Sequence, residues 1–573
     1  MKYKKYLAVM MSAAVITTSA VPAAVFAEST TETENISEEF ENSSEDASEK
    51  ASEEEKALSE VSGQDDEGSE NTTESDTDKK EKPNGEKPDG VPEKPNGEKP
   101  DGMPGDPGQG GPGGGADTQT YDYSGEVKGI VTADNEEVLS EGAEISSEES
   151  DVNALLAQNG GSLVVKDSTI TKFGDDDNGD NCNFYGVNSI ALSTGENSQL
   201  KISDATLSSD STGSNAIFAT DNATAYASNT TIITSKDNSR GLDATYGGTI
   251  VADSVKIQTS GDHSASIATD RGGGSISVTN STLNTEGSGS PLLYSTGNIE
   301  VNSVTGTASG SQIAGMEGLN TILISNSDLS SSITEATASD PLANGVIIYQ
   351  STSGDAETST GDTARFQVVD STLTSSIDSG AMFYVTNTTA DILLSGTTLN
   401  FDSTNTKLLQ IEGNDSNNWG KAGSNGGTVT FTALGETLDG DISVDTISSL
   451  DLYLLDATTY TGSTEITENE ENTDAKEKVI TVNIDADSTW VVMEDSTVNV
   501  LNAEEGAQII DKNGKTVKIV ANGETVVEGN SDITLTVTDS CGDTVTTDES
   551  NTVSDTSIER ADFDNYYGTS TVY

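Results

Sequence analysis

The chain has 573 residues, of which 97 are acidic and 28 are basic, so its formal net charge at pH 7 is -69. Nucleic acids and anionic lipid surfaces are bound through clusters of Lys and Arg, so this charge balance excludes both as partners. It favours cations and solubility instead.

The N-terminus has the three parts of a secretory signal peptide. Lysines precede an apolar run that ends near Val21, and Val25-Phe26-Ala27 form a small-residue cleavage pattern. We therefore expect residues 1–27 to be removed. No later stretch has the length of apolar residues that spans a bilayer, so we expect no membrane insertion after cleavage. The mature protein should be extracellular or loosely associated with the cell surface.

Residues 28–120 have the composition of a tether. The first part is rich in Glu, Ser, Thr and Asp, and such segments do not bury enough apolar surface to offset the entropy of ordering. The sequence KPNGEKPDG then occurs at 82–90 and again at 94–102, followed by a Gly- and Pro-rich stretch. We expect an extended linker, stiff at its prolines and flexible at its glycines.

A repeat begins after this linker. Its unit is an alternating strand, a corner residue of the Asp or Asn type, and a second strand that starts with Ser or Thr, as in SLVVKDSTI (162–170) and SISVTNSTL (275–283). The corners fall at Asp167, Asp204, Asn229, Asp253, Asn280, Asn326, Asp370 and Gly396. An aliphatic residue stands two positions before each: Val165, Ile202, Ala227, Val251, Val278, Ile324, Val368 and Leu394.

The repeat predicts an all-β fold, a right-handed parallel β-helix with a rung of about 24 residues and about twelve rungs in all. Asp, Asn and Gly tolerate the left-handed backbone conformation that a one-residue corner needs. A third element, such as SIALST (189–194), recurs in the same rungs, so each rung should run strand, corner, strand, variable loop, strand and short turn. The β-helix should span 121–548, with caps at 121–160 and beyond Leu501, and 549–573 should be a tail.

Several strings in these rungs resemble a family of secreted, adhesin-like parallel β-helix proteins of Gram-positive gut bacteria. They include FYGVNS (184–189), SRGLDATYGGTI (239–250), GVIIYQSTSGDA (345–356) and MFYVTNTTA (382–390). The fold that this resemblance implies also resembles the pectate-lyase-like superfamily, which includes both enzymes and carbohydrate binders. A shared fold does not decide between those functions.

Catalytic motifs are sparse. The single histidine, His263, has no serine or cysteine motif beside it, and the residue set of polygalacturonases is absent. Arg240 and Arg271 are flanked by Asp243 and Asp270, and we expect ion pairs rather than a cationic base. Acidic residues are so common that carboxylate pairs carry little information on their own.

Two groups of residues are candidate ligand sites. Asp175, Asp176, Asp177 and Asp180 put four carboxylates in one loop, which makes calcium a possible cofactor, although the spacing is not that of an EF-hand. Trp419, in a Gly- and Asn-rich loop, is the best candidate for an exposed aromatic that stacks on a sugar, and Tyr246 and Tyr294 are further candidates.

The sequence therefore favours a non-enzymatic, adhesin-like protein that binds a glycan or a surface partner. The alternatives are a polysaccharide-active enzyme, either a hydrolase or a lyase, and a purely structural exoprotein. Two or three carboxylates that meet an aromatic wall in a cleft would favour the enzyme. The long loops 171–188, 330–345, 400–427 and 459–478 are the segments that could form such a cleft.

Overall fold

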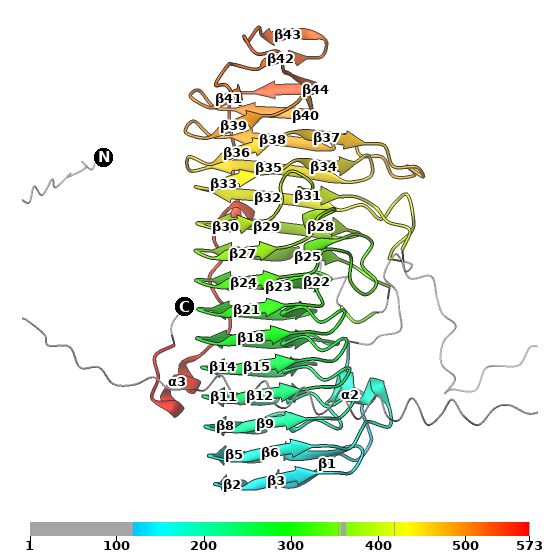
Figure 1. Cartoon of the computed structure of the whole chain (residues 1–573), viewed down its shortest axis with the longest axis vertical. Coiled ribbons are helices and arrows are strands. Elements are labelled where there is room, and N and C mark those ends of the chain that lie inside the picture. Colours follow the sequence, from blue (N-terminus) through cyan, green and yellow to red (C-terminus); the bar gives the residue numbers. More distant parts are fainter. Residues whose placement is uncertain (1–118, 353, 357–362, 417–418, 572–573) are drawn as a thin grey trace, which may run out of the picture. The chain divides into compact units, whose positions relative to one another are not determined.

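The computed structural model describes residues 119–352, 354–356, 363–416 and 419–571, and these form a tall stack of parallel strands (Figure 1). The expected signal peptide and nearly all of the expected linker lie outside the described residues. Regular structure in the described chain is almost entirely β, with two short α-helices, α2 (Gly179–Tyr185) and α3 (Ala561–Tyr567), and the 3₁₀ helix η1 (Glu549–Asn551).

Four sheets run along the stack. Sheet A consists, in spatial order, of β1 (Lys128–Asp134), β4 (Val152–Gln158), β7 (Ala191–Thr194), β10 (Ile217–Thr220), β13 (Leu242–Ala244), β16 (Ile267–Thr269), β19 (Leu293–Ser295), β22 (Ala314–Glu317), β25 (Asn344–Tyr349), β28 (Ala381–Thr386), β31 (Lys407–Ile411), β34 (Ile442–Asp445) and β37 (Thr464–Thr467). Sheet B consists of β2 (Glu137–Glu141), β5 (Ser162–Lys166), β8 (Gln199–Ser203), β11 (Thr224–Ser228), β14 (Thr249–Asp253), β17 (Ser275–Thr279), β20 (Asn298–Asn302), β23 (Thr321–Ser325), β26 (Ala364–Val369), β29 (Thr389–Ser395), β32 (Thr428–Leu434), β35 (Ser449–Leu455), β38 (Ile480–Ile484), β40 (Ser496–Ala503), β42 (Lys518–Ala521), β43 (Glu524–Val527) and β44 (Thr534–Gly542). Sheet C consists of β3 (Glu144–Ser147), β6 (Thr169–Lys172), β9 (Thr206–Ser209), β12 (Thr231–Thr234), β15 (Lys256–Thr259), β18 (Thr282–Thr285), β21 (Thr305–Ala308), β24 (Asp328–Ser331), β27 (Thr372–Ser375) and β30 (Thr398–Asn400), and sheet D of β33 (Thr437–Asp439), β36 (Thr459–Gly462), β39 (Thr489–Val492) and β41 (Gln508–Asp511).

Between β2 and β37, each rung contributes one strand to sheet B, one to sheet C or D and one to sheet A, in the order that the repeat predicts, and the strands after β37 belong to sheets B and D only. Strands of successive rungs pair in parallel, as β8 does with β11 and β9 with β12. The prediction of an all-β solenoid of parallel strands is confirmed. In the segment 121–160, which is expected to cap this end of the solenoid, β1, β2 and β3 pair in parallel with β4, β5 and β6.

The corners have the left-handed backbone that the repeat predicts. Positive φ angles between 46° and 64° occur at seven of the eight predicted positions: Asp167, Asp204, Asn229, Asn280, Asn326, Asp370 and Gly396. The eighth position is wrong by one residue, because Ser254 (φ 57°) occupies the corner and Asp253 ends β14. The strand register explains this, since Asp253 pairs with Thr279, the residue before a corner.

Side chains at the corners also bond along the stack. Asn229 Nδ2 donates to Asp204 Oδ1 at 2.6 Å, and Asn280 Nδ2 donates to Asp253 Oδ1 at 2.7 Å. These bonds join neighbouring rungs at the solenoid edge and support an architectural role for the corner residues.

The core lies inside the ring of sheets. Successive rungs of sheet B place Val165, Ile202, Ala227, Ala252 and Val278 at the same level, and all five are 0% exposed. The predicted inward column is therefore correct except at Val251, which is shifted with its corner. Because every inward residue packs on the rungs above and below, the repeated aliphatic column stabilises the stack.

The segment expected to be a tail is bound to the solenoid. Residues 549–571, here called the C-terminal strap, run back along the outer face of sheet B (Figure 1). Asn551 Nδ2 donates to Thr432 Oγ1 at 2.8 Å near one end of the strap, and Tyr567 OH donates to the carbonyl of Ile202 at 3.1 Å near the other. The strap therefore fastens the rungs between β32 and β8.

Candidate functional site

The outer face of sheet A carries large and polar side chains in register. Successive rungs align Ala268, Tyr294, Gly315, Ile347 and Tyr384 in one outward column. A second outward column, two positions further along the strands, contains Glu317 of β22, Tyr349 of β25 and Thr386 of β28. Side chains two positions apart on a strand point to the same face, so the columns lie side by side.

A first cavity of about 300 Å³ lies over β16, β19, β22 and β25. Its floor includes Asp270, Tyr294 and Tyr349, and its walls come from α2, which contains Phe184, and from the loop that contains Asp340. The loops 171–188 and 330–345, which the sequence singles out as cleft-forming, both contribute to this wall.

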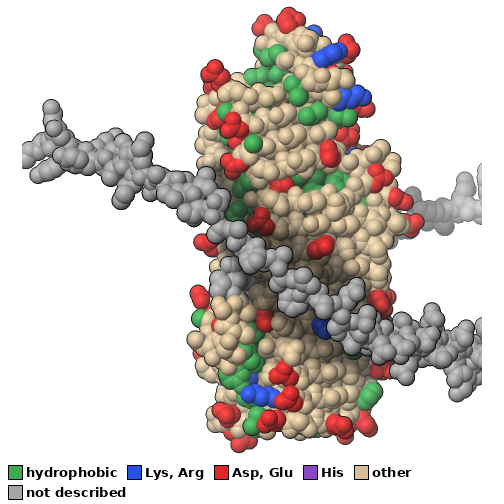
Figure 2. Space-filling model, turned by 60° about the vertical axis from the view of Figure 1, so that its left-hand side comes forward, with side chains coloured by type: hydrophobic (Ala, Val, Ile, Leu, Met, Phe, Trp, Pro, Cys, Tyr) green, Lys and Arg blue, Asp and Glu red, His purple; other side chains and the backbone are tan. Residues whose placement is uncertain are grey.

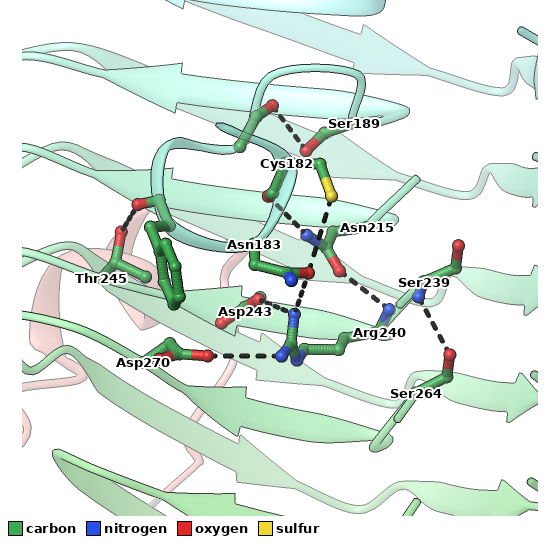
Figure 3. A network of polar contacts seen from close by, with 12 residues as sticks. Cys182, Asn183, Ser189, Asn215, Ser239, Arg240, Asp243, Thr245, Ser264 and Asp270 are labelled. Carbon is green, nitrogen blue, oxygen red and sulfur yellow. Dashed lines mark hydrogen bonds and ion pairs between the residues drawn. The ribbon is translucent and has the colours of Figure 1, made fainter. Parts of the chain in front are cut away.

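Arg240 is the cation of this cavity and is almost fully buried, with 8% of its surface exposed. Figure 3 shows its guanidinium between Asp243 and Asp270, with Asn183 on a third side. The nitrogen-to-oxygen distances are 3.5 Å to Asp243, 3.3 Å to Asp270 and 2.9 Å to Asn183 Oδ1. The predicted ion pairs of Arg240 are confirmed. Arg271, for which the sequence also predicts an ion pair, forms it with Asp355.

The two carboxyls beside Arg240 are difficult to ionise together. Burial raises the pKa of Asp243 well above its usual value, and neither of its oxygens accepts a hydrogen bond in the described chain. Burial also raises the pKa of Asp270 to about 7, and the charge of Arg240 opposes this rise. One guanidinium thus faces two buried carboxyls, so a proton is retained more easily here than on an exposed Asp.

Tyr294 is fixed by a buried carboxyl. Its hydroxyl donates to Glu317 Oε2 at 2.9 Å, and the Ser351 hydroxyl also donates to Glu317. Burial raises the pKa of Glu317, whereas these two hydrogen bonds favour its charged form. The bonds hold the Tyr294 ring in position at the floor of the first cavity.

A second cavity, of about 350 Å³, lies over the next rungs of the same sheet. Tyr384 of β28 lines it and is 0% exposed, and its hydroxyl has no hydrogen-bond partner in the described chain. Its acidic lining residues are Glu412, Asp415, Glu470 and Glu471. These come from the loops 400–427 and 459–478, so all four loops that the sequence singles out line one cavity or the other.

The two cavities are neighbours. Asp340 lines the first and Pro341 lines the second, and Tyr349 and Tyr384 stand on the paired strands β25 and β28. Between them Trp419 stacks on Tyr349, with ring centroids 4.3 Å apart. We call the two cavities together the sheet A groove.

The aromatic residues that the sequence proposes have different positions. Tyr294 lines the first cavity, as a ligand-binding residue should. Tyr246 is 6% exposed and stacks on Tyr185, with ring centroids 5.5 Å apart. The expected exposure of Trp419 is wrong: the side chain is 7% exposed, because Ile347, Tyr349 and Tyr384 form an apolar bed for it.

The four aspartates proposed for calcium do not form a metal site. Asp175 Oδ1 accepts a hydrogen bond from the Thr212 amide at 2.8 Å, and Asp180 lies in the first turn of α2. Among the described residues, no group of three or more His, Cys, Asp and Glu side chains is arranged to hold a metal ion.

Some residues of the groove could not be identified from the sequence. Glu317, Asp340 and Asp355 stand in no motif, and the chain has 97 acidic residues, some of which are scattered over the face in Figure 2. The signal that could find Glu317 is its register with Tyr349 in the outward column, which requires the rung alignment to be complete beyond position 326.

Comparisons with models of protein families, with curated proteins and with solved structures found no match for this chain. Within the described part, no helix is long and apolar enough to cross a membrane.

Proposed function

We propose that the chain is a secreted, adhesin-like protein whose right-handed parallel β-helix binds an extended glycan in the sheet A groove without cleaving it. The signal-peptide pattern at 1–27 supports secretion, and the acidic linker at 28–120 supports a role as a tether at the cell surface. Right-handed winding is supported by the general handedness of connections between parallel strands.

The observation that carries this proposal is the convergence of the four long loops on one face. Each of them lines one of two adjacent cavities over sheet A. Ligand sites are concave and combine apolar or aromatic walls with a few placed polar groups, and the first cavity has this composition. Successive rungs lie about 4.8 Å apart, which suits contacts with consecutive units of a polymer.

The carboxyls of the first cavity already have partners within the protein, and this favours binding over catalysis. Asp270 and Asp243 are engaged by Arg240, and Asp340 accepts a hydrogen bond from Asn344 Nδ2 at 2.8 Å. These partners support a role for the carboxyls in holding the walls of the groove.

The test is a glycan panel of pectins, xylans and host glycans, applied to the full chain and to Ser339→Trp. Ser339 is exposed and lines the first cavity, so a tryptophan there should fill the groove. Ser146→Trp, on the outer face of sheet C, is the matched control. We expect a panel member to bind the wild type and the control but not Ser339→Trp. Equal binding by all three would place the ligand elsewhere, and no binding would favour a structural exoprotein or a surface protein as partner.

A polysaccharide-active enzyme is the second candidate, and one observation favours it. Asp270 and Asp340 line the same cavity beside Tyr294, and burial raises the pKa of each carboxyl to about 7. A carboxylic acid that keeps its proton near neutral pH can serve as a general acid. This candidate predicts release of reducing ends or unsaturated sugars from a panel member, and loss of that release in Asp270→Asn or Asp340→Asn.

A further inference from the structure

The second cavity of the sheet A groove has an excess of negative charge. Glu412, Asp415, Glu470 and Glu471 line it, and among the described residues that line it there is no Lys or Arg. The first cavity is closer to neutral, because Asp243, Asp270 and Asp355 pair with Arg240 and Arg271, and burial raises the pKa of Asp340 to about 7.

The cations near the first cavity are already neutralised by the protein. Arg240 is held by Asp243 and Asp270, and Arg271 pairs with Asp355 while its guanidinium lies 3.5 Å from the centre of the Phe184 ring. Among the described residues of the lining, no cation is therefore left over to attract an acidic ligand. The uncompensated charges of the groove are the carboxylates of the second cavity.

One buried polar group points independently to a ligand that forms hydrogen bonds. Tyr384 lines the second cavity, is fully buried, and has a hydroxyl without a hydrogen-bond partner in the described chain. A buried hydroxyl without a partner costs free energy, and a ligand group that pairs with it recovers that cost.

The carboxylates of the groove are distributed rather than gathered. In the described chain, no three of the acidic side chains converge as metal ligands do. A small divalent cation would therefore find no site here, whereas a long ligand with a positive charge on each unit could pair with several carboxylates of the second cavity at once.

We propose that the sheet A groove binds a glycan of amino sugars whose amines are free and protonated, in preference to neutral, acidic or N-acetylated glycans. This inference rests on the proposed function and specifies its ligand class. The hydroxyl of Tyr384 and the ring of Tyr294 favour a polyhydroxylated sugar chain over a Lys-rich peptide, because they supply a hydrogen-bonding group and a face for stacking.

The experiment is calorimetric titration of the full chain with oligomers of equal length made of glucosamine, N-acetylglucosamine, glucose or lysine. The variant Glu470→Gln/Glu471→Gln removes two exposed carboxylates from the second cavity. Its control, Glu524→Gln/Glu528→Gln, removes two exposed carboxylates in and next to β43, at the far end of the stack (Figure 1). Both variants change the net charge equally, so they separate binding in the groove from general attraction to an acidic protein.

We expect glucosamine oligomers to bind the wild type and the control equally, and to bind the groove variant about tenfold more weakly. Tyr384→Phe should also weaken this binding without a change in net charge. The inference is overturned if both double variants weaken binding to the same degree, or if lysine oligomers bind and glucosamine oligomers do not. It is overturned alone, with the proposed function intact, if N-acetylated or neutral oligomers bind in the groove as tightly. If no glycan binds, both fail.

Discussion

Arg560 and Ser277 are 283 residues apart in sequence, yet the Arg560 guanidinium donates to both the carbonyl and the hydroxyl of Ser277, at 2.9 and 2.8 Å. It also donates to the carbonyl of Ala252 and the hydroxyl of Thr279. This one side chain therefore ties the C-terminal strap to two neighbouring rungs of sheet B. Because Arg560 is buried at 7% exposure, its bonds are sheltered from competition with water.

Arg560→Ala should release the strap and leave the rungs folded. The substitution removes several charge-assisted hydrogen bonds and leaves their acceptors unpaired, at a cost of about 2–4 kcal/mol for local opening. Hydrogen exchange should accelerate in 549–571 and stay slow in β14 and β17. Lys512→Ala, an exposed cation near the end of the stack, is the control. Unchanged protection of the strap would show that Arg560 is not its fastening.

The corner at Asn280 should discriminate between side chains by their backbone preference. Asn280 has a φ of 50° and donates to Asp253 Oδ1. Asn280→Gly loses this bond but accepts the left-handed conformation, whereas Asn280→Val loses the bond and is strained as well. Chemical denaturation should give a valine variant less stable than the glycine variant by about 1–2 kcal/mol. Equal stability of the two would contradict a left-handed corner.

Asp270 should make stability depend on pH. Burial, opposed by Arg240, raises its pKa from 3.8 to about 7. At pH values between these two, the folded protein therefore keeps a proton on Asp270 that the unfolded chain loses. The contribution of Asp270 to the free energy of unfolding is therefore largest at low pH and falls as pH rises from about 4 to 7. Asp270→Asn removes this contribution. The melting temperature of the wild type, relative to the variant, should accordingly decrease from about pH 4.5 to about pH 7.5.

The control for this comparison is Glu524→Gln, which removes an exposed negative charge elsewhere. General repulsion among the many carboxylates also weakens at low pH, and the control reports that effect alone. A relative melting temperature that is the same at both pH values, or that rises with pH, would mean that burial does not raise the pKa of Asp270.

Calcium should not stabilise the fold through the loop at 174–181. A ligand that binds only the folded state raises the melting temperature by mass action. Because Asp175, Asp176, Asp177 and Asp180 are not arranged as a metal site, we expect equal melting temperatures in EDTA and in calcium. A rise in calcium that disappears in Asp175→Asn/Asp180→Asn would restore the calcium site that the sequence suggests.

Features that depend on neighbouring residues could be predicted from the sequence, whereas features that depend on contacts between distant residues could not. The corner at Asn280 and the inward Val278 repeat in every rung, so their backbone and burial could be predicted from spacing. The burial of Trp419 depends on Tyr349, which stands in a different rung, and no local pattern records that contact. The strap depends on Arg560 meeting Ser277, and the tail is too short and irregular to carry a periodic signal.

If one extended glycan occupies both cavities of the sheet A groove, its affinity must depend on its length, and a length series is the sharpest experiment. Affinities of oligomers of increasing length should be measured for the wild type, for Asp340→Asn in the first cavity and for Glu412→Gln in the second. We expect affinity to rise with length until the oligomer spans both cavities and then to level off, and we expect each variant to weaken only the oligomers long enough to reach its cavity. Affinity that is independent of length, or unaffected by both substitutions, would contradict this expectation.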